Sequence, residues 1–268
     1  MHSQASMPGL RRYQKWYSHA ADTDVVLAYD RFAASVGAHK SILNDRACDK
    51  MPDRPVSPPE SPGVPLRPLS DEARRRSLAD TLAAGPGAGP VWLFAYGSLM
   101  WSPCFGFDAQ ITATLEGYRR AFNFWSVVAR GTPEAPGLGL GLEPGGACRG
   151  ILYRLSESRR ESDLEAIWAR EMLSDVYMPR WLPVATPDGA RMALCFVTNP
   201  AHDFYTGMQE QDTAARLIAR ATGTKGRCRD YLAETVAALA RHGLADPELN
   251  ELLALVDRAI SAAAADRS

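Results

Sequence analysis

Apolar and polar positions follow a strand-like pattern in the middle of the chain and a helix-like pattern towards its C-terminus. Seven short runs rich in β-branched and aromatic residues, separated by Gly and Pro, predict strands. They are Val91–Ala95, Ile111–Tyr118, Ala121–Val128, Leu138–Leu142, Gly150–Leu155, Trp181–Ala185 and Met192–Thr198. The 3.6-residue periodicity predicts one helix within this series and three after it, at residues 158–173, 208–221, 228–242 and 247–264.

A further helix is predicted just before the first strand. Ser70 is a helix N-cap residue, and Asp71 and Glu72 place acids in the first turn, where the helix dipole favours them. The Gly-Pro-Gly sequence at residues 85–87 ends the pattern. Strands first and helices afterwards, with one helix inserted, predict an α+β fold with a mixed or barrel-like sheet.

A glycine-rich segment at residues 137–145 is similar to a nucleotide-binding loop, but the similarity is superficial. The third glycine of the G-x-G-x-x-G pattern falls on Pro144, and no helix follows. We interpret the segment as a strand in which glycines, having no side chain, allow another chain segment or a ligand to come close.

Proline content divides the chain. Residues 52–68 hold seven prolines in 17 positions, a composition that excludes a helix or a central strand. We therefore expect a poorly ordered or weakly helical extension over residues 1–50, a proline-rich linker over 51–69 and a folded domain over 70–265.

Composition narrows the class of partner and the compartment. The net charge is −1 and no long basic cluster occurs, which argues against nucleic-acid binding. Five scattered cysteines and five scattered histidines form neither a disulfide framework nor a metal-binding motif, so no metal is expected. No apolar run reaches the roughly 20 residues of a membrane helix, and no signal peptide is recognisable. A reducing, cytoplasmic location is the expectation.

One carboxylate lies on the apolar face of the inserted helix. Leu164, Ile167, Trp168 and Met172 form an apolar stripe, and Glu171 falls within it. One interpretation is structural, with Glu171 paired to an arginine such as Arg120 or Arg180 at the helix end. The other is that burial raises the pKa of the carboxyl, so that it takes and returns a proton near neutral pH.

The first strand ends abruptly in the sequence FAYGSLMW, residues 94–101. Gly97 would let a ligand touch the backbone, and the N–H groups of residues 97–99 could converge on an anion between two hydroxyl side chains. The alternative is a plain strand-to-turn exit with Ser98 as a cap.

Taken together, these features are more specific. The sequences VWLFAYGSLMW, EGYRRAF, IWAREM, NPAHDFY and TGTKGRCRDYL follow one another in this order between residues 91 and 232. With them, residues 70–260 resemble the ChaC-type, glutathione-specific γ-glutamylcyclotransferases.

The resemblance implies a γ-glutamylcyclotransferase fold, a small mixed β-barrel with surrounding helices. It implies a lyase-type reaction that releases 5-oxoproline and cysteinylglycine from reduced glutathione, without cofactor or metal. Glu171 matches the family's catalytic glutamate. The substrate-binding loop matches Leu93, Phe94, Ala95, Tyr96, Gly97, Ser98 and Leu99.

Three further positions follow from the comparison with the family pattern. The family usually has glycine where this chain has Ala95, which matters only if that position needs a positive φ. Arg120 is expected either to pair with a substrate carboxylate, to orient Glu171, or to form a structural ion pair. Tyr205 is expected either to close over the pocket or to pack at its rim.

Other functions remain open at this level. The chain could be a cyclotransferase for other γ-glutamyl amides, since nothing in the sequence identifies a binding site for the Cys-Gly half. It could be a γ-glutamyl-binding module without turnover, although Glu171 argues against this. A hydrolase using Ser98 or Cys104 lacks a Gly-x-Ser-x-Gly motif and a histidine nearby in the sequence. The oligomeric state is not predicted.

Overall fold

The computed structural model describes residues 65–265. The predicted N-terminal extension and most of the predicted linker lie outside these residues. Residues 65–69, the last part of that linker, are in neither helix nor strand. They nevertheless contact the domain, because Leu66 and Leu69 pack against the core and the Leu69 N–H donates to the Leu173 carbonyl at 2.9 Å.

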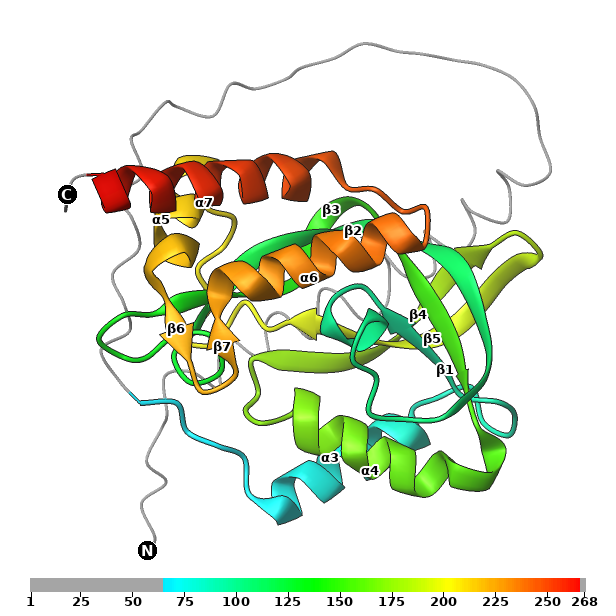
Figure 1. Cartoon of the computed structure of the whole chain (residues 1–268). Helices are drawn as coiled ribbons and strands as arrows, with labels where there is room; N and C mark the ends of the chain where they lie inside the picture. The colour runs from blue at the N-terminus through cyan, green and yellow to red at the C-terminus, as the bar shows by residue number, and fades with distance from the viewer. Residues whose placement is uncertain (1–64, 266–268) are drawn as a thin grey trace, which may run out of the picture. The chain divides into compact units, whose positions relative to one another are not determined.

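The centre of the domain is a closed β-barrel with the strand order β1-β3-β2-β4-β5 (Figure 1). The strands are β1 (Trp92–Ala95), β2 (Phe107–Ser126), β3 (Gly137–Leu155), β4 (Tyr177–Thr186) and β5 (Gly189–Thr198). All neighbours pair antiparallel except β1 and β5, whose parallel pairing at Leu93 and Leu194 closes the barrel. The mixed, barrel-like sheet expected from the sequence is confirmed.

Two of these strands are much longer than predicted. The four runs 111–118, 121–128, 138–142 and 150–155 are parts of only two strands, β2 and β3. Gly145 and Gly146, between the last two runs, have positive φ angles but lie within β3. Gly117, inside the first run, also has a positive φ and lies at a register shift between Glu116 and Tyr118. A β-bulge bends a strand without ending it, and its local sequence is similar to that of a turn.

Helices cover the barrel on two sides in Figure 1. Helices α3 (Asp71–Ala83) and α4 (Arg160–Glu171) lie beside each other at the bottom of the view. Helices α5 (Gln211–Arg220), α6 (Cys228–Arg241) and α7 (Pro247–Ala265) lie at the top. Two 3₁₀ turns, η1 (Ser98–Met100) and η2 (Glu157–Arg159), complete the helical elements of residues 65–265.

Ser70 is the N-cap residue of α3, as predicted. The Ser70 hydroxyl accepts a hydrogen bond from the Ala73 N–H at 3.1 Å. Two indole N–H groups then attach the helix to its neighbours. Trp168 on α4 donates to the Ser77 hydroxyl at 3.2 Å, and Trp181 on β4 donates to the Thr81 carbonyl at 2.8 Å. The first of these bonds fixes the helix that carries Glu171 against α3, and the second fixes β4 against it.

Residues 222–227, which lie between the predicted helices 208–221 and 228–242, form a small hairpin. Strands β6 (Thr222–Gly223) and β7 (Gly226–Arg227) pair antiparallel between α5 and α6. The hairpin is attached to the chain after β2, because the Thr224 N–H donates to the Val128 carbonyl at 2.8 Å and the Lys225 N–H to the Ala129 carbonyl at 2.9 Å. Such pairings between distant segments leave no local sequence signal.

The glycine-rich segment is a strand, as interpreted from the sequence. It forms the first part of β3, and its glycines leave room for side chains of neighbouring strands. A Cβ added to Gly139 would lie 2.1 Å from the Phe124 ring, and one added to Gly141 would lie 1.8 Å from Thr198 Oγ1. The glycines therefore serve packing inside the barrel wall.

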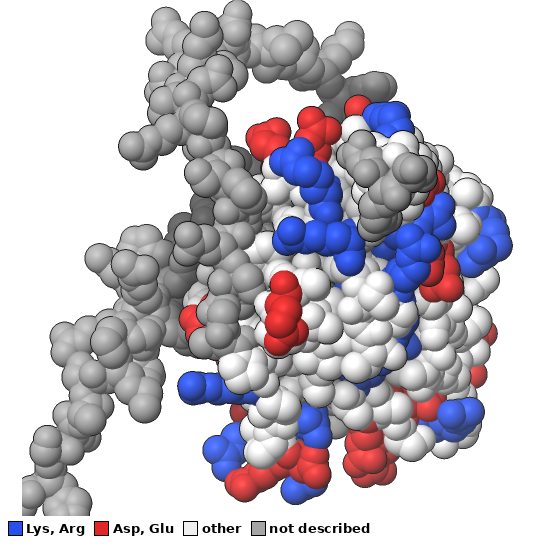
Figure 2. Space-filling view, turned by 60° about the vertical axis from the view of Figure 1, so that its left-hand side comes forward, with Lys and Arg blue, Asp and Glu red and all other residues white. Residues whose placement is uncertain are grey.

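Charged side chains of both signs lie close together on the face drawn in Figure 2. This agrees with the net charge of −1. Among residues 65–265, no helix is long and apolar enough to cross a membrane. The same residues contain no cluster of three or more His, Cys, Asp or Glu side chains that could hold a metal ion.

Candidate active site

The FAYGSLMW segment leaves the barrel at the end of β1. Ala95 is the last residue of this strand and pairs with Ile151 of β3, and the turn η1 begins at Ser98. The position where the family usually has glycine therefore has the extended conformation of a strand, which alanine adopts without strain. The replacement of that glycine does not alter the loop that follows.

Gly97 lies in the narrowest part of this loop. A Cβ on Gly97 would come within 3.3 Å of Leu140 Cδ2 and 3.4 Å of the Tyr231 hydroxyl. The distance to Leu140 is slightly shorter than an ordinary carbon contact, and the distance to the Tyr231 hydroxyl is at the limit of one. Because glycine has no side chain, a ligand can reach the backbone at this position between β3 and α6.

The loop leaves backbone donors available. The N–H groups of Met100 and Trp101 donate back to the Gly97 and Ser98 carbonyls at 3.0 and 3.3 Å. Within residues 65–265, the N–H groups of residues 97–99 have no such acceptor. Because buried N–H groups normally find a partner, these three are suited to bind the oxygens of a ligand.

Glu171 is the last residue of α4, and its side chain is 14% exposed. The apolar stripe predicted from the sequence is confirmed, because Leu164, Ile167 and Trp168 are each no more than 2% exposed. The carboxylate lies on their face of the helix and lines a small space of about 20 Å³ enclosed by residues 94–99. The helix and the loop thus place a carboxylate and free N–H groups around one space.

The ion-pair partner of Glu171 is its neighbour Arg170. Arg170 Nε lies 3.1 Å from Glu171 Oε1, but the N–H is not directed at this oxygen. Oε1 is buried and receives no hydrogen bond from residues 65–265. A buried acceptor without a donor is costly, so this oxygen is available to a substrate group that carries a proton.

Arg170 also connects α4 with the loop. Its guanidinium donates to the Ser98 hydroxyl oxygen at 2.7 Å and to the Ser102 carbonyl. Since Ser98 Oγ accepts this bond, its own O–H proton points elsewhere. Among residues 65–265, the Ser98 hydroxyl accepts this bond and donates none of its own.

Burial determines the protonation of the site. It raises the pKa of the Glu171 carboxyl above its ordinary value of 4.5, while the positive charges of Arg170 and Lys225 oppose the rise. A carboxyl whose pKa lies above the ordinary value exchanges protons more readily near neutral pH. This is the electrostatic condition expected for a general base and acid.

Three tyrosines surround the carboxylate, and their hydroxyls stay neutral. Burial raises the pKa of Tyr96, Tyr177 and Tyr231, and the negative charge of Glu171 adds to each rise. Tyr96 donates to the Phe196 carbonyl and Tyr177 to the Leu140 carbonyl, both at 2.7 Å. The first two tyrosines are therefore held in the wall, while Tyr231 faces the loop at Gly97.

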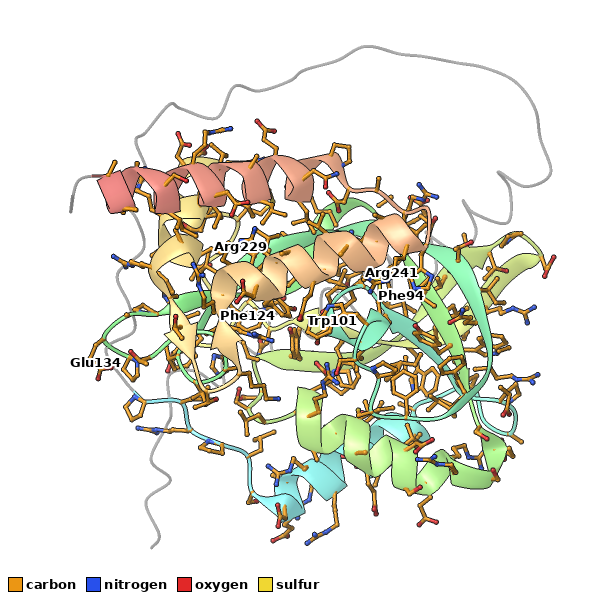
Figure 3. All side chains as sticks on the ribbon, in the orientation of Figure 1. Phe94, Trp101, Phe124, Glu134, Arg229 and Arg241 are labelled. Carbon is orange, nitrogen blue, oxygen red and sulfur yellow. The ribbon has the colours of Figure 1, made fainter. Side chains whose placement is uncertain are left out.

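A larger cavity of about 310 Å³ opens from this site. Its lining includes Ser98, Arg170 and Glu171, together with residues 124–130 and Lys225. Two of its aromatic residues, Trp101 and Phe124, are labelled in Figure 3 between α6 and the strands. The volume is at the lower end of the range for small-molecule sites.

Arg120 lies elsewhere, which corrects two expectations for this residue. Its side chain is 4% exposed and does not reach Glu171 or either space beside it. It donates to the Tyr96 carbonyl at 2.6 Å, to the Arg149 carbonyl at 2.5 Å and to Asp246 Oδ2 at 2.6 Å. Each of its three side-chain nitrogens donates within the protein, so Arg120 holds the loop through the Tyr96 carbonyl.

Tyr205 is also outside the cavity. Its hydroxyl donates to Glu143 Oε1 at 2.5 Å, and its backbone bridges to Phe124. It therefore supports the wall that Phe124 forms, in line with the expectation of rim packing.

The structure brings three unassigned residues into the site. Arg170 precedes Glu171 in the sequence IWAREM, and Lys225 and Tyr231 belong to TGTKGRCRDYL. Both sequences carry the family resemblance, so a signal was present. The packing of the 222–227 hairpin against residues 128–129 could not be predicted from the sequence. This packing brings Lys225 to the cavity.

The structure disfavours nucleophilic catalysis at Cys104. Burial raises the pKa of the Cys104 thiol, whereas a nucleophilic cysteine needs a lowered value. Of the histidines in residues 65–265, His202 accepts from the Phe204 N–H and lies 3.4 Å from Asp175 Oδ1. His242 caps the end of α6. Neither lines the space beside Ser98.

Known proteins share both the fold and the sequence. A crystal structure of a γ-glutamyl cyclotransferase specific to glutathione from yeast matches with a TM-score of 0.58 at 21% identity, covering 64% of this chain and 97% of that one. The fold is therefore that of the γ-glutamylcyclotransferases.

Sequence comparison identifies the family. The model of the ChaC-like protein family matches residues 91–259. The glutathione-specific γ-glutamylcyclotransferase of Escherichia coli strain K12 is 40% identical over 193 residues, 72% of this chain and 84% of that protein. γ-Glutamylcyclotransferase 2-3 of Arabidopsis thaliana is 31% identical over 173 residues, 60% of this chain and 86% of that protein. The chain belongs to the ChaC-like family.

Proposed function

We propose that this chain is a glutathione-specific γ-glutamylcyclotransferase, which cleaves reduced glutathione to 5-oxoproline and cysteinylglycine. The observation that carries the proposal is the buried Glu171 Oε1, which lacks a hydrogen bond and lines the same space as the free N–H groups of the loop. The names of the relatives from Escherichia coli and yeast support glutathione as the substrate.

The reaction is an intramolecular aminolysis. The α-amine of the γ-glutamyl group attacks its own γ-carbonyl carbon and closes a five-membered ring, and the bond to the cysteine nitrogen breaks. Because nucleophile and electrophile belong to one molecule, the enzyme mainly has to hold the folded conformer. The substrate supplies every reacting atom, so the proposed chemistry needs neither cofactor nor metal.

Glu171 transfers protons in this scheme. Its carboxylate accepts a proton from the α-ammonium, which makes the amine a nucleophile, and after the attack the ring nitrogen loses a second proton as it becomes the lactam N–H. The departing cysteine nitrogen gains two protons and leaves as an ammonium group. One carboxyl can carry these protons in turn, because the number removed from the α-nitrogen equals the number delivered to the leaving nitrogen. The pKa raised by burial suits both steps.

The loop holds the γ-glutamyl group during this transfer. The N–H groups of residues 97–99 and the free O–H of Ser98 bind its anionic oxygens, and Tyr231 closes the opposite side. Leu93, Phe94 and Ala95 are buried strand residues that anchor the loop, and Tyr96 and Leu99 line the space. Arg170 positions Ser98 and Glu171 relative to each other.

The test is a product assay. Purified protein is incubated with reduced glutathione in a metal-free buffer, and 5-oxoproline and cysteinylglycine are followed by mass spectrometry, with γ-Glu-Ala in parallel. We expect both products from glutathione and none from γ-Glu-Ala. Turnover of γ-Glu-Ala would assign the chain to the broader class of γ-glutamyl amide cyclotransferases. Binding of glutathione without products would indicate a γ-glutamyl-binding module.

The proposal also covers location and domain limits. We place the reaction in a reducing, cytoplasmic setting, where free thiols such as those of Cys104, Cys148, Cys195 and Cys228 are common. The substrate is a small molecule, and we propose no nucleic-acid partner. We assign catalysis to residues 70–265 and none of it to residues 1–50.

The pH dependence of catalysis follows from Glu171. We expect kcat/KM to fall as the pH drops through the raised pKa of this carboxyl, because the protonated form cannot accept a proton. The midpoint of this acid limb should lie above 4.5. The measurement is kcat/KM against pH, with circular dichroism at each pH to verify folding. A midpoint at or below 4.5 in folded protein would contradict the role of Glu171.

Gly97→Ala tests the close approach in the loop. The added methyl would make a close contact with Leu140, touch the Tyr231 hydroxyl and narrow the space beside Glu171. We expect kcat/KM for glutathione to fall by on the order of tenfold to a hundredfold. Ala95→Gly is the matched control, because it changes a strand residue two positions earlier, and its kcat/KM should stay close to that of the wild type. Equal effects of both substitutions would refute the special role of Gly97.

A further inference from the structure

We propose that Lys225, supported by Arg130, binds the glycine carboxylate of glutathione and so selects the tripeptide over shorter γ-glutamyl compounds. This inference rests on the proposed function, because it takes the γ-glutamyl end of the substrate to lie at Glu171. It assigns the recognition of the Cys-Gly half, for which the sequence showed no candidate.

The structure fixes Lys225 at the wall of the larger cavity. The Lys225 N–H donates to the Ala129 carbonyl at 2.9 Å, which attaches the β6–β7 hairpin to the segment after β2. The Arg130 guanidinium donates to the Lys225 carbonyl at 2.5 Å and lies 5.1 Å over the Tyr231 ring. Both side chains line the cavity that Glu171 lines. The backbone is therefore held, and the Lys225 ammonium is free to meet a ligand.

The charges of this cavity are not balanced. Its lining contains one carboxylate, Glu171, and three cations, Arg130, Arg170 and Lys225. Arg170 is paired with Glu171. Within residues 65–265, no carboxylate lies within 4.0 Å of Lys225 or Arg130. Two positive charges thus remain without an acidic partner in a partly enclosed space, which favours an anionic ligand.

Glutathione has the matching charges. At neutral pH it carries two carboxylates and one ammonium group. The ammonium and the first carboxylate belong to the γ-glutamyl end and must lie at Glu171 and the loop for the reaction to occur. The second carboxylate is at the other end of the molecule, beyond the cysteine. Lys225 and Arg130 line the same cavity and form no ion pair, so they are the cations available to this second carboxylate.

The same geometry explains discrimination against dipeptides. In γ-Glu-Ala the second carboxylate is one residue nearer the reacting carbonyl than in glutathione. A cation positioned for the glycine carboxylate of glutathione would leave the second carboxylate of γ-Glu-Ala unpaired. A desolvated carboxylate without a partner weakens binding. Lys225 would thus act as a specificity-determining residue that takes no part in proton transfer.

The experiment compares two substrates and three proteins. The substrates are glutathione and its glycine amide, which lacks the second carboxylate but has the same reacting atoms. The proteins are the wild type, Lys225→Met and the control Arg227→Met. Arg227 is an exposed cation on the same hairpin whose side chain does not line the cavity. Arg130 is not substituted, because it also holds hairpin carbonyls.

We expect the wild type to prefer glutathione over the amide by on the order of tenfold in kcat/KM, mainly through KM. In Lys225→Met, kcat/KM for glutathione should fall by about this factor of ten, so that the ratio of kcat/KM for glutathione to that for the amide is near one. The charge of Lys225 also acts on Glu171, but this effect is common to both substrates and cancels in the ratio. Arg227→Met should keep the wild-type ratio.

Two results would overturn the inference. One is equal turnover of glutathione and its amide by the wild type. The other is a Lys225→Met variant that loses activity equally on both substrates and so keeps the preference. If the wild type turns over neither substrate, the proposed function has failed. Calorimetric binding of glutathione and its amide then decides on Lys225: a preference that Lys225→Met removes supports it, and an unchanged preference refutes it.

Discussion

Glu171→Gln should lower kcat for glutathione by about 10²- to 10⁴-fold, the range that a general base and acid contributes. Glutamine has nearly the same shape but cannot accept the ammonium proton or return one to the leaving amine. The space beside the loop is preserved, so glutathione should still bind. Single-turnover product formation measures the chemical step, and calorimetry measures binding.

A matched control for this variant lies on the same helix. Glu165→Gln makes the same chemical change at an exposed position of α4. It should keep activity close to that of the wild type. Substantial activity in a folded Glu171→Gln variant, or an equal loss in Glu165→Gln, would remove Glu171 from the mechanism.

The thermal stability of Glu171→Gln shows whether the variant is folded, and we expect it to change in a defined direction. The folded-state pKa of this carboxyl is raised above its ordinary value. Its favourable contribution is therefore present below the unfolded-state pKa and lost as the pH rises through the folded-state value. Near neutral pH the carboxylate destabilises the fold, and glutamine should raise the melting temperature. This gain should shrink as the pH falls to about 4.

Arg120→Met should lower the free energy of unfolding by about 3 kcal/mol, the cost of removing one partner of a buried ion pair. It leaves Asp246 without its cation and the Tyr96 and Arg149 carbonyls without their donor. Asp246 also accepts from the Leu249 N–H at the start of α7, so the loss extends to that helix. Chemical denaturation measures the change.

Arg119→Met is the control for this prediction, because Arg119 is an exposed arginine at the preceding position. It should leave the stability close to that of the wild type. Arg120→Met should also lower kcat/KM, since the Tyr96 carbonyl that it holds belongs to the substrate loop. A stable Arg120→Met protein with only a raised KM would instead indicate that Arg120 binds substrate directly.

Helices were predicted more closely than strands, for a local reason. The cap at Ser70 and the stripe of α4 depend on residues within a few positions of each other. The lengths of β2 and β3 depend on pairing between distant residues, such as Leu115 with Cys148. Whether Gly145 and Gly146 end a strand or bend it is decided by the strand opposite, which the local sequence does not contain.

The same division applies to the site. The burial of Glu171 follows from the periodicity of one helix, and the loop after β1 from one short sequence. The pairing of Arg170 with Glu171 was not predicted, because adjacent helical residues normally point apart. It forms because the long Arg170 side chain folds over to Ser98 at the helix end.

The sequence by itself determined the order of strands and helices, the burial of Glu171 and the family resemblance, because each depends on residues that are close together in the sequence. Only the tertiary structure decided that Arg120 serves the fold, that Tyr205 supports the wall and that Lys225 lines the cavity. Arginine, tyrosine and lysine have the same chemistry at any position in the chain. What each one does depends on the distant segments that packing brings beside it, here Asp246, Glu143 and Ala129.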